Sequence, residues 1–366
     1  MRTSIGFGAL LGISGLLGLP ALAADGFSLR HNMTGGLGAE MFSVSTTPGW
    51  SGVLSYAHTS IDRVTGDDGQ LLRTTVPAGS VKIGATANAL QDPTYPAQAV
   101  GVAVTGSQKV FTLALTRTSE DLTAGGRWQL SAIVPYGTKS LQVKPVNSIP
   151  ALTWPSTSSL SGSAQNSVFA GSFSPVYQAG INQLASSESG GVSGWGDAEF
   201  TAQWVKSDAS SRLVLGAGLI VPTGRYSAIS GPDIGSGNYY TFKPSAIYVH
   251  RWEGKYAAGA RVAYGMNTTN RDNQVRSGNF AGLELAASAL TAVGSIGVHW
   301  MHAQQTQDDT GGKWGANRYR HSTAGLSFAT LIPNTHWGLS VQTSRTLSSR
   351  NAQEGGFIQI KLGRSF

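Results

Sequence analysis

The chain ends in the stretch FIQIKLGRSF, residues 357–366, in which apolar and polar side chains take turns. Successive side chains of a β-strand point to opposite faces of the sheet. Ile358, Ile360 and Leu362 therefore share one face with the terminal Phe366, and polar or small residues form the other. Because soluble proteins rarely end in the middle of a strand, this stretch predicts a last strand that needs a partner.

The same alternation recurs through the second half of the chain. Stretches with this pattern span residues 198–204, 256–264, 283–288, 296–301, 323–329 and 336–343. A soluble β-sandwich also alternates, but Tyr256 and Tyr264 bracket an apolar face as the interfacial aromatics of membrane barrels do. Eight residues apart, they would lie about 26 Å apart along a strand and about 19 Å apart across a membrane at a 45° tilt. We therefore expect one face to contact lipid and the other a lumen.

The links between these stretches alternate in length. Long links at residues 304–317, 267–279 and 226–238 alternate with tight turns at 333–335, 290–291, 253–254 and 207–211, and a moderate link spans 348–354. Membrane barrels place long loops outside and short turns in the periplasm, whereas a sandwich has no reason to sort them. The sequence predicts an all-β fold: a transmembrane antiparallel up-and-down β-barrel of a bacterial outer membrane.

The strand number depends on the first third of the chain. Nine strands are predicted from Gly194 to the end, with three or five before them. Residues 51–58, 110–115 and 128–134 read as strands, and residues 81–87 are a further one. We predict twelve strands, with fourteen as the alternative.

The first 24 residues have the features of a cleaved signal peptide. Arg2 precedes an apolar stretch from Ile5 to Leu19, Pro20 breaks it, and small residues follow at Ala21–Ala24. No later run of about 18 apolar residues could span a membrane as a helix. We therefore expect a signal peptide at residues 1–24 and a single barrel at 25–366, with a long loop rich in Ser and Gly at about 138–193. We expect this loop to fold partly into the barrel mouth.

Composition excludes several classes of protein. The chain has 366 residues, no Cys, 48 Gly, 12% charged residues and a formal net charge of +7. It therefore has no disulfides and no Cys-based zinc site. The positive charge would suit anionic solutes or the phosphates of lipopolysaccharide, or it belongs to solvated loops. We found no phosphate-binding Gly loop and no basic–aromatic array for nucleic acid.

Three short motifs resemble the signature of a known family. They are Gly194-Trp195-Gly196-Asp197, Gly216-Ala217-Gly218 and Pro222-Thr223-Gly224-Arg225-Tyr226, with weaker support at residues 134–136, 240–244, 264–268 and 276–278. Together they are similar to outer-membrane transporters of the MetA-pathway of phenol degradation family, from about Gly125 to Phe366. The resemblance implies a single barrel that takes up or exports small, often hydrophobic or aromatic compounds. From the residues alone, the Pro-Thr-Gly segment reads as an architectural strand end.

The polar face supplies the candidate site residues. Those predicted to line a pore are Asp197, Glu199, Gln203, Arg261, Glu284, His321, Gln342, Gln359 and Lys361. Opposite charges inside a barrel either pair across the lumen or line a wet path. Asp197 and Glu199 share a face and could act as an acid–base pair, but their position favours a structural or pore-lining role.

The spacing of the His and Ser residues offers little support for catalysis or metal binding. His321 and Ser322 are adjacent, so on a strand they point to opposite faces, and only Thr323 shares the face of His321. His299 and His302 are likewise split, so no metal pair follows. We predict no enzyme, cofactor or metal. The function favoured is passage of small molecules, the alternative is a structural or surface barrel without flux, and a lipid hydrolase ranks third.

The expected partners follow from the fold. They are outer-membrane lipid, lipopolysaccharide, an unidentified small solute, and the barrel-assembly machinery through the strand that ends in Phe366.

Overall fold

The computed structural model describes residues 13–14, 40–43, 47–84, 87–227, 232–312 and 317–366. Twelve strands in these ranges form one closed antiparallel β-barrel. They are β2 (Gly49–Ile61), β7 (Gln98–Thr118), β8 (Arg127–Val146), β10 (Ala198–Ser207), β11 (Ser211–Val221), β12 (Thr241–Trp252), β13 (Tyr256–Asn267), β14 (Phe280–Thr291), β15 (Gly294–Gln305), β16 (Arg320–Leu331), β17 (Trp337–Arg350) and β19 (Gly356–Ser365). The prediction of twelve strands, nine of them after Gly194, is confirmed.

The barrel closes where the chain ends. Strand β19 pairs with β17 on one side and with β2 on the other. The amide of Trp50 donates to the carbonyl of Phe366 at 3.0 Å, and the amide of Phe366 donates back to Trp50 at 2.8 Å. Closure leaves the barrel wall without an open edge, which a membrane would not tolerate.

The outer face is apolar, as the alternation predicts. Leu113, Leu130, Val262, Val298 and Leu326 are all more than half exposed, and their side chains point away from the lumen. Their strand neighbours on the inner face are small or polar. In the part of the chain that the structure describes, every helix is too short or too polar to cross a membrane by itself. The exposed apolar belt is therefore the surface that contacts lipid.

Short turns gather at one end of the barrel and long links at the other. The β12–β13 link has three residues, 253–255, and places Glu253 and Gly254 at positive φ, 54° and 64°, a backbone conformation common in tight hairpin turns. The long links 222–240, 268–279 and 306–319 lie at the opposite end. Because β19 ends beside the short turns, that end is periplasmic and the end with long links faces outside. The expected sorting of links is confirmed.

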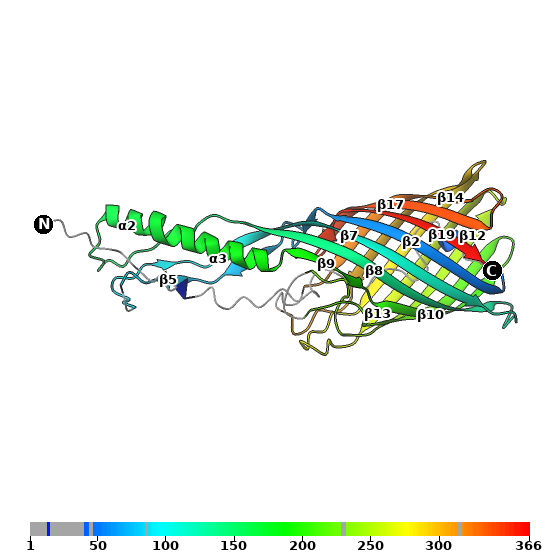
Figure 1. The fold of residues 1–366 in the computed structure, drawn as a ribbon, viewed down its shortest axis with the longest axis horizontal. Coiled ribbons are helices and arrows are strands. Elements are labelled where there is room, and N and C mark those ends of the chain that lie inside the picture. The colour runs from blue at the N-terminus through cyan, green and yellow to red at the C-terminus, as the bar shows by residue number, and fades with distance from the viewer. Residues whose placement is uncertain (1–12, 15–39, 44–46, 85–86, 228–231, 313–316) are drawn as a thin grey trace.

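A large extension continues beyond the outer end of the barrel (Figure 1). Strands β7 and β8 run past the wall as one long ribbon, β7 pairing with β4 (Arg73–Val76) and β8 with β9 (Gly190–Trp195). The extension also holds β5 (Gly79–Val81), β6 (Thr94–Tyr95), helix α2 (Gly162–Val168), a π-helical turn (Phe169–Phe173) and α3 (Ser174–Ser187). β1 (Ile13–Ser14) pairs with β5, and β3 (Arg63–Val64) pairs with β18 (Gln353–Glu354).

The extension has its own hydrophobic core. Phe173, Tyr177 and Ile181 of the helices pack against strand residues of the same region, among them Tyr95 and Val100. The rings of Tyr95 and Phe173 lie 5.2 Å apart. Helix α2, the π-helical turn and α3 follow one another directly, and Pro175, which has no backbone amide, is the second residue after the π-helical turn.

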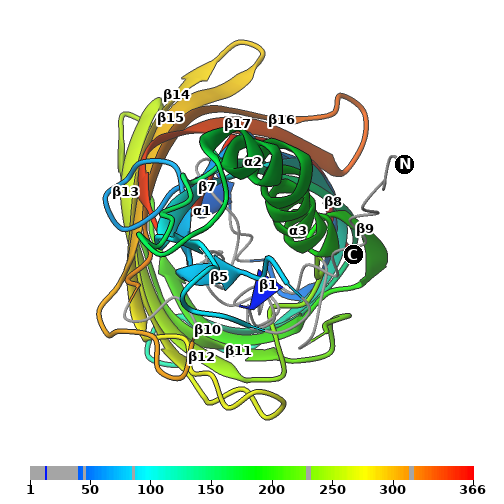
Figure 2. The same ribbon diagram turned by 90° about the vertical axis from the view of Figure 1, so that its left-hand side faces the viewer.

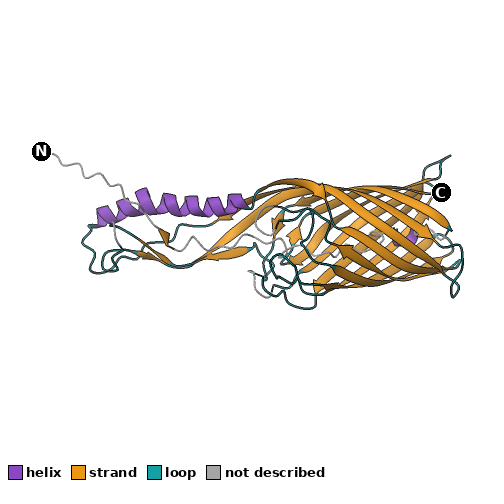
Figure 3. Cartoon of the chain, turned by 60° about the horizontal axis from the view of Figure 1, so that its bottom comes forward, coloured by secondary structure: helices purple, strands orange, loops and turns teal. Residues whose placement is uncertain are grey.

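Two expectations for this region differ from the structure. Residues 138–193, expected to be a loop that enters the mouth, instead contain the end of β8, the helices and β9, and they project away from the barrel (Figure 3). A separate hydrophobic core makes that possible, and local composition did not reveal it. Residues 81–87 do not form a barrel strand, since β5 ends at Val81. The predicted signal peptide lies outside the described residues except for Ile13–Ser14, and it stays a prediction.

Candidate functional site

The inner wall of the barrel carries most of the polar residues singled out from the sequence. Glu199 and Gln203 on β10, Arg261 on β13, Glu284 on β14, His321 on β16, Gln342 on β17, and Gln359 and Lys361 on β19 all alternate with outward-facing neighbours. The exposed fractions of Arg261 and Val262, 0% and 51%, show the alternation on one strand. The alternation of faces predicted for these strands is confirmed, whereas a pore-lining role for these residues stays a prediction. The ring of strands that surrounds them is seen along the barrel in Figure 2.

One ion pair is completely buried inside the barrel. Arg261 and Glu284 are direct register partners on β13 and β14. The Nε of Arg261 lies 3.6 Å from Oε2 of Glu284, and both side chains are 0% exposed. Removing one member of such a pair would strand a charge without its partner, which typically costs several kcal/mol. The pair thus cancels the net charge of the wall at this height.

A second ion pair bridges three strands. Nζ of Lys243 on β12 lies 3.2 Å from Oε1 of Glu199 on β10. The lysine reaches across β11, where its register partner is Gly218, a residue without a side chain in the way. Sequence reasoning missed Lys243, because a partner two strands away leaves no local signal.

Neutral contacts continue around the wall. The side-chain amide of Gln342 donates to Oε1 of Gln359 at 2.6 Å, and the two are register partners. Nε2 of His321 lies 3.0 Å from Oγ1 of Thr346. These contacts fix the polar side chains to the wall rather than leaving them to extend into the lumen.

The periplasmic half of the inner wall is apolar instead. Val205, Val214, Ile247 and Val249 face inward there and are at most 2% exposed. They pack around Met41, which is itself 0% exposed. Met41 belongs to α1 (Glu40–Ser43), a short helix that lies inside the barrel (Figures 2 and 3). Helix α1, which precedes the first barrel strand in the chain, therefore occupies the lumen.

The wall is shaped to receive this helix. A Cβ added to Gly259 would lie 2.7 Å from Sδ of Met41, so only glycine leaves room for the methionine. Nη1 of Arg212 donates to the carbonyl of Phe42 at 3.0 Å, and Nη2 of Arg251 donates to the same carbonyl at 3.4 Å. Cations at carbonyls left open by a helix end are favourable. The sequence signal for this docking was the apolar pair Met41–Phe42, between the predicted signal peptide and the first strand.

Asp197 ties the outer rim together. Its carboxylate accepts from the amide of Gly224 at 3.0 Å and from the amide of Ser236 at 2.9 Å. Thr223 adds two bonds, donating from Oγ1 to the carbonyl of Gly196 and accepting from the amide of Ala198. A Cβ on Gly224 would meet Asp197 at 2.7 Å, so the turn requires glycine. The motifs at residues 194–197 and 222–226 thus fold onto each other, and we call this contact the clamp. Asp197 and Glu199 have separate partners instead of forming an acid–base pair.

His299 and His302 lie on opposite faces of β15, and His321 and Ser322 lie on opposite faces of β16. His299 is buried on the inner face, while His302 stacks on Trp300 at 5.9 Å on the outer face. Ser322 contacts His302 rather than His321, with 2.7 Å between Oγ and Nδ1, a neighbour pair that sequence spacing did not reveal. Oε1 of Gln304 lies 3.4 Å from Nε2 of His302, where a catalytic triad usually places a carboxylate. Among the described residues, no group of three or more His, Cys, Asp or Glu could hold a metal ion.

Comparison with known proteins identifies the family of this barrel. The family model for the MetA-pathway of phenol degradation matches residues 91–362. The chain belongs to this family. The phenol-degradation family match covers the clamp and the barrel strands from β7 to Leu362 within β19, but not α1 or β2. No curated protein gives a match to the chain.

Three solved structures show differing degrees of similarity to this chain. An outer-membrane channel from Pseudomonas putida is 16% identical, with a TM-score of 0.58 over 93% of this chain and 99% of that chain. The β domain of the Bordetella autotransporter BrkA is 11% identical over 86% of this chain and 99% of its own, with a TM-score of 0.44. The Pseudomonas putida toluene transporter TodX is 10% identical over 95% and 98%, with a TM-score of 0.36. The first of these supports an outer-membrane barrel fold for this member of the phenol-degradation family.

Proposed function

We propose that the barrel lets small, uncharged and largely apolar molecules, aromatic compounds among them, cross the outer membrane. The observation that carries this proposal is the apolar patch on the inner wall around Met41. A lumen built for ions or sugars would need polar groups at that height, because an apolar wall cannot replace the hydrogen bonds of a hydrated solute. An apolar solute loses nothing there and gains contact with the wall.

The ion pairs support the same solute class. Within each of the pairs Arg261–Glu284 and Lys243–Glu199 the two charges offset each other, so neither pair leaves a net charge to attract an ion. We propose that these residues line the path together with the inward-facing Gln203, His321, Gln342, Gln359 and Lys361, and that Asp197 holds the rim at the mouth of the path. Their role is then to hold the wall in shape while a neutral solute passes.

Passage would require α1 to move. Among the described contacts, the helix is held by the packing of Met41 and Phe42, by two bonds to the carbonyl of Phe42, and by one from Nη1 of Arg212 to the carbonyl of Met41 at 3.5 Å. We propose that α1 leaves the patch when a solute crosses, and that the solute uses the same apolar surface. The family's link to phenol degradation and the description of the Pseudomonas putida structure as an outer-membrane channel fit this proposal.

A disulfide lock tests the route. The chain has no Cys, so the double variant Met41→Cys/Gly259→Cys would place two thiols where Met41 meets the wall. Uptake of phenol by cells expressing the wild-type protein should exceed that of cells without it, and benzoate, the charged solute with the same ring, should not follow. Oxidation of the double variant should stop phenol uptake, and a reductant should restore it; each single-Cys variant is the control.

The outcome separates the two main functions. Full phenol uptake through a barrel whose thiols are confirmed to be cross-linked would refute the proposed route. A structural barrel without flux is the second candidate, favoured by the occupied lumen and the paired charges, and it predicts no uptake in any variant. We propose no enzymatic activity, since Gln304 stands where a triad needs a carboxylate. We also propose that the assembly machinery recognises the strand that ends in Phe366.

A further inference from the structure

A row of aromatic rings crosses the outer face of four neighbouring strands near the outer end. Tyr56, Phe111, Tyr136 and Trp195 are successive register partners on β2, β7, β8 and β9. The rings of Tyr56 and Phe111 lie 5.0 Å apart, and those of Tyr136 and Trp195 lie 5.2 Å apart. Below the row the face is apolar, with Leu113 61% exposed. Aromatic rows of this kind mark the level at which lipid tails give way to headgroups.

Two residues further toward the outer end of these strands, the outward-facing side chains are polar instead of aromatic. The next outward-facing register partners are His58, Lys109, Thr138 and Ser193. The row above them consists of Ser60, Ser107, Ser140 and Gly191. Two residues along a strand span about 7 Å, so this polar surface lies at headgroup level directly above the aromatic row. It offers hydroxyl groups and a lysine where a lipid presents its polar part.

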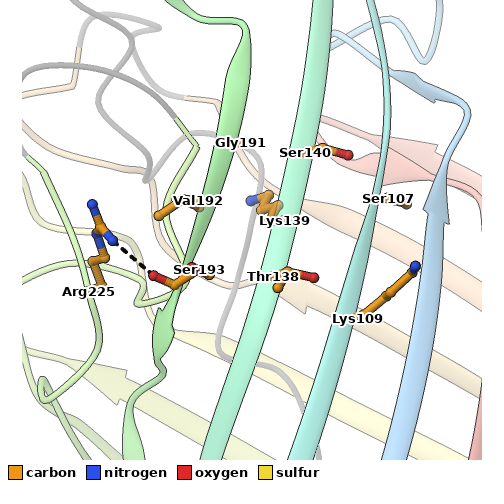
Figure 4. Close-up of a pocket in the computed structure, with 9 residues that line it drawn as sticks. All are labelled: Ser107, Lys109, Thr138, Lys139, Ser140, Gly191, Val192, Ser193 and Arg225. Atoms are coloured by element: carbon orange, nitrogen blue, oxygen red, sulfur yellow. Dashed lines mark hydrogen bonds between the residues drawn. The ribbon is translucent and has the colours of Figure 1, made fainter.

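The polar rows border an open hollow of about 450 Å³. Ser107, Lys109, Thr138, Ser140, Ser193 and Arg225 are among its lining residues. Figure 4 shows Lys109 and Arg225 on opposite sides of the group, with Thr138 and Ser193 between them. Arg225 comes from the clamp segment, and its Nη1 donates to the carbonyl of Ser193 at 3.0 Å. The clamp thus brings one cation to a surface whose other cation comes from β7.

Among the ion pairs of the described residues, neither Lys109 nor Arg225 has a carboxylate partner. Lys139, which also lines the hollow, differs because Asp233 acts on it as an opposite charge. Two unpaired cations that flank hydroxyl groups suit a phosphate, which accepts charge-assisted hydrogen bonds from several donors at once.

We propose that this hollow binds a phosphate of the phosphorylated glycolipid of the outer leaflet, lipid A. Lys109 and Arg225 contact the phosphate, the hydroxyl rows contact the sugar, and the acyl chains descend past Phe111 and Tyr136 onto the apolar belt. The amphipathic order of the surface, apolar then aromatic then cationic and hydroxylic, is what selects an anchored lipid over a free anion. The site lies on the outside of the wall and is separate from the proposed path of solutes.

Binding of lipid A to the purified barrel in detergent tests this site. Native mass spectrometry would follow titrations with lipid A, with its fully dephosphorylated form, and with inorganic phosphate. The variant Lys109→Gln should bind lipid A roughly ten- to hundredfold more weakly than the wild type, the usual loss for one charge-assisted contact. The control Lys255→Gln removes an exposed lysine at a periplasmic turn, and it should bind like the wild type.

Each result decides the proposal. Arg225→Gln should show the same loss of affinity for lipid A. If this variant fails to fold because Arg225 belongs to the clamp, Lys109→Gln still tests the site. Equal affinity of the wild type and Lys109→Gln, or an equal loss in Lys255→Gln, would overturn the site. Displacement of lipid A by millimolar inorganic phosphate would assign the hollow to free phosphate instead. Phenol uptake by Lys109→Gln should stay at the wild-type rate, so a failure of this site is distinguishable from a failure of the proposed function.

Discussion

Replacing Met41 should open the lumen. Its side chain is 0% exposed against the apolar wall, and burying a methionine stabilises by about 1.5–3 kcal/mol. Met41→Ser should lose about 2 kcal/mol of that, because serine contributes little apolar contact. A loss of 2 kcal/mol shifts the ratio of undocked to docked α1 about 30-fold. The fraction of time that the barrel spends in a higher conductance state should rise by a comparable factor.

Single-channel recording in planar bilayers measures this fraction directly. Met266 provides the control, since it lies outside the lumen on β13 and is 36% exposed. Met266→Ser makes the same chemical change without touching α1. Gly259→Ala is a second way to displace the helix, because its new Cβ would meet Met41. If folded Met41→Ser conducts like the wild type and Met266→Ser, the packing of Met41 does not hold the lumen closed, and the reasoning fails.

Three further predictions concern assembly, topology and pH. Deleting Phe366 removes the two backbone bonds between Phe366 and Trp50 of β2 and should lower the amount of heat-modifiable barrel in outer membranes; unchanged levels would contradict this. Cysteine at Thr310 should react with an impermeant thiol reagent on intact cells and cysteine at Asn334 should not, and the reverse labelling would invert the topology. Burial raises the pKa of Asp233 from 3.8 to about 6, so its contribution to stability is full below pH 3.8 and is lost as the pH rises through about 6. Hydrogen exchange at its partner amide, Ser227, corrected for the intrinsic rate, should show less protection at about pH 7 than at about pH 5, and Asp233→Asn should remove the difference.

The clamp explains why short motifs identify this family. Gly224 and Asp197 are 27 residues apart, yet a Cβ on the glycine would collide with the carboxylate that its own amide contacts. Substituting either residue would loosen the segment that carries Arg225 to the outer face. The motif thus reflects packing of the rim rather than contact with a solute.

Local pattern alone determined the strands and their faces. Because strand side chains alternate with a period of two, the placement of Arg261 inward and Val262 outward followed from neighbours in the sequence. The turn at Glu253 and Gly254 was likewise legible, since a tight hairpin needs residues that tolerate positive φ. Strand number and topology followed from these two local signals.

Only the tertiary structure decided what fills and flanks the barrel. The pairing of Lys243 with Glu199 depends on two strands that meet across a third. The docking of Met41 on the wall depends on a space that Gly259 leaves open far along the chain. The helices at residues 162–187 lie outside the mouth because they pack with Tyr95 and Val100 in a separate hydrophobic core. Such contacts join residues distant in sequence, and no local period encodes them, so they appear only when the chain has folded.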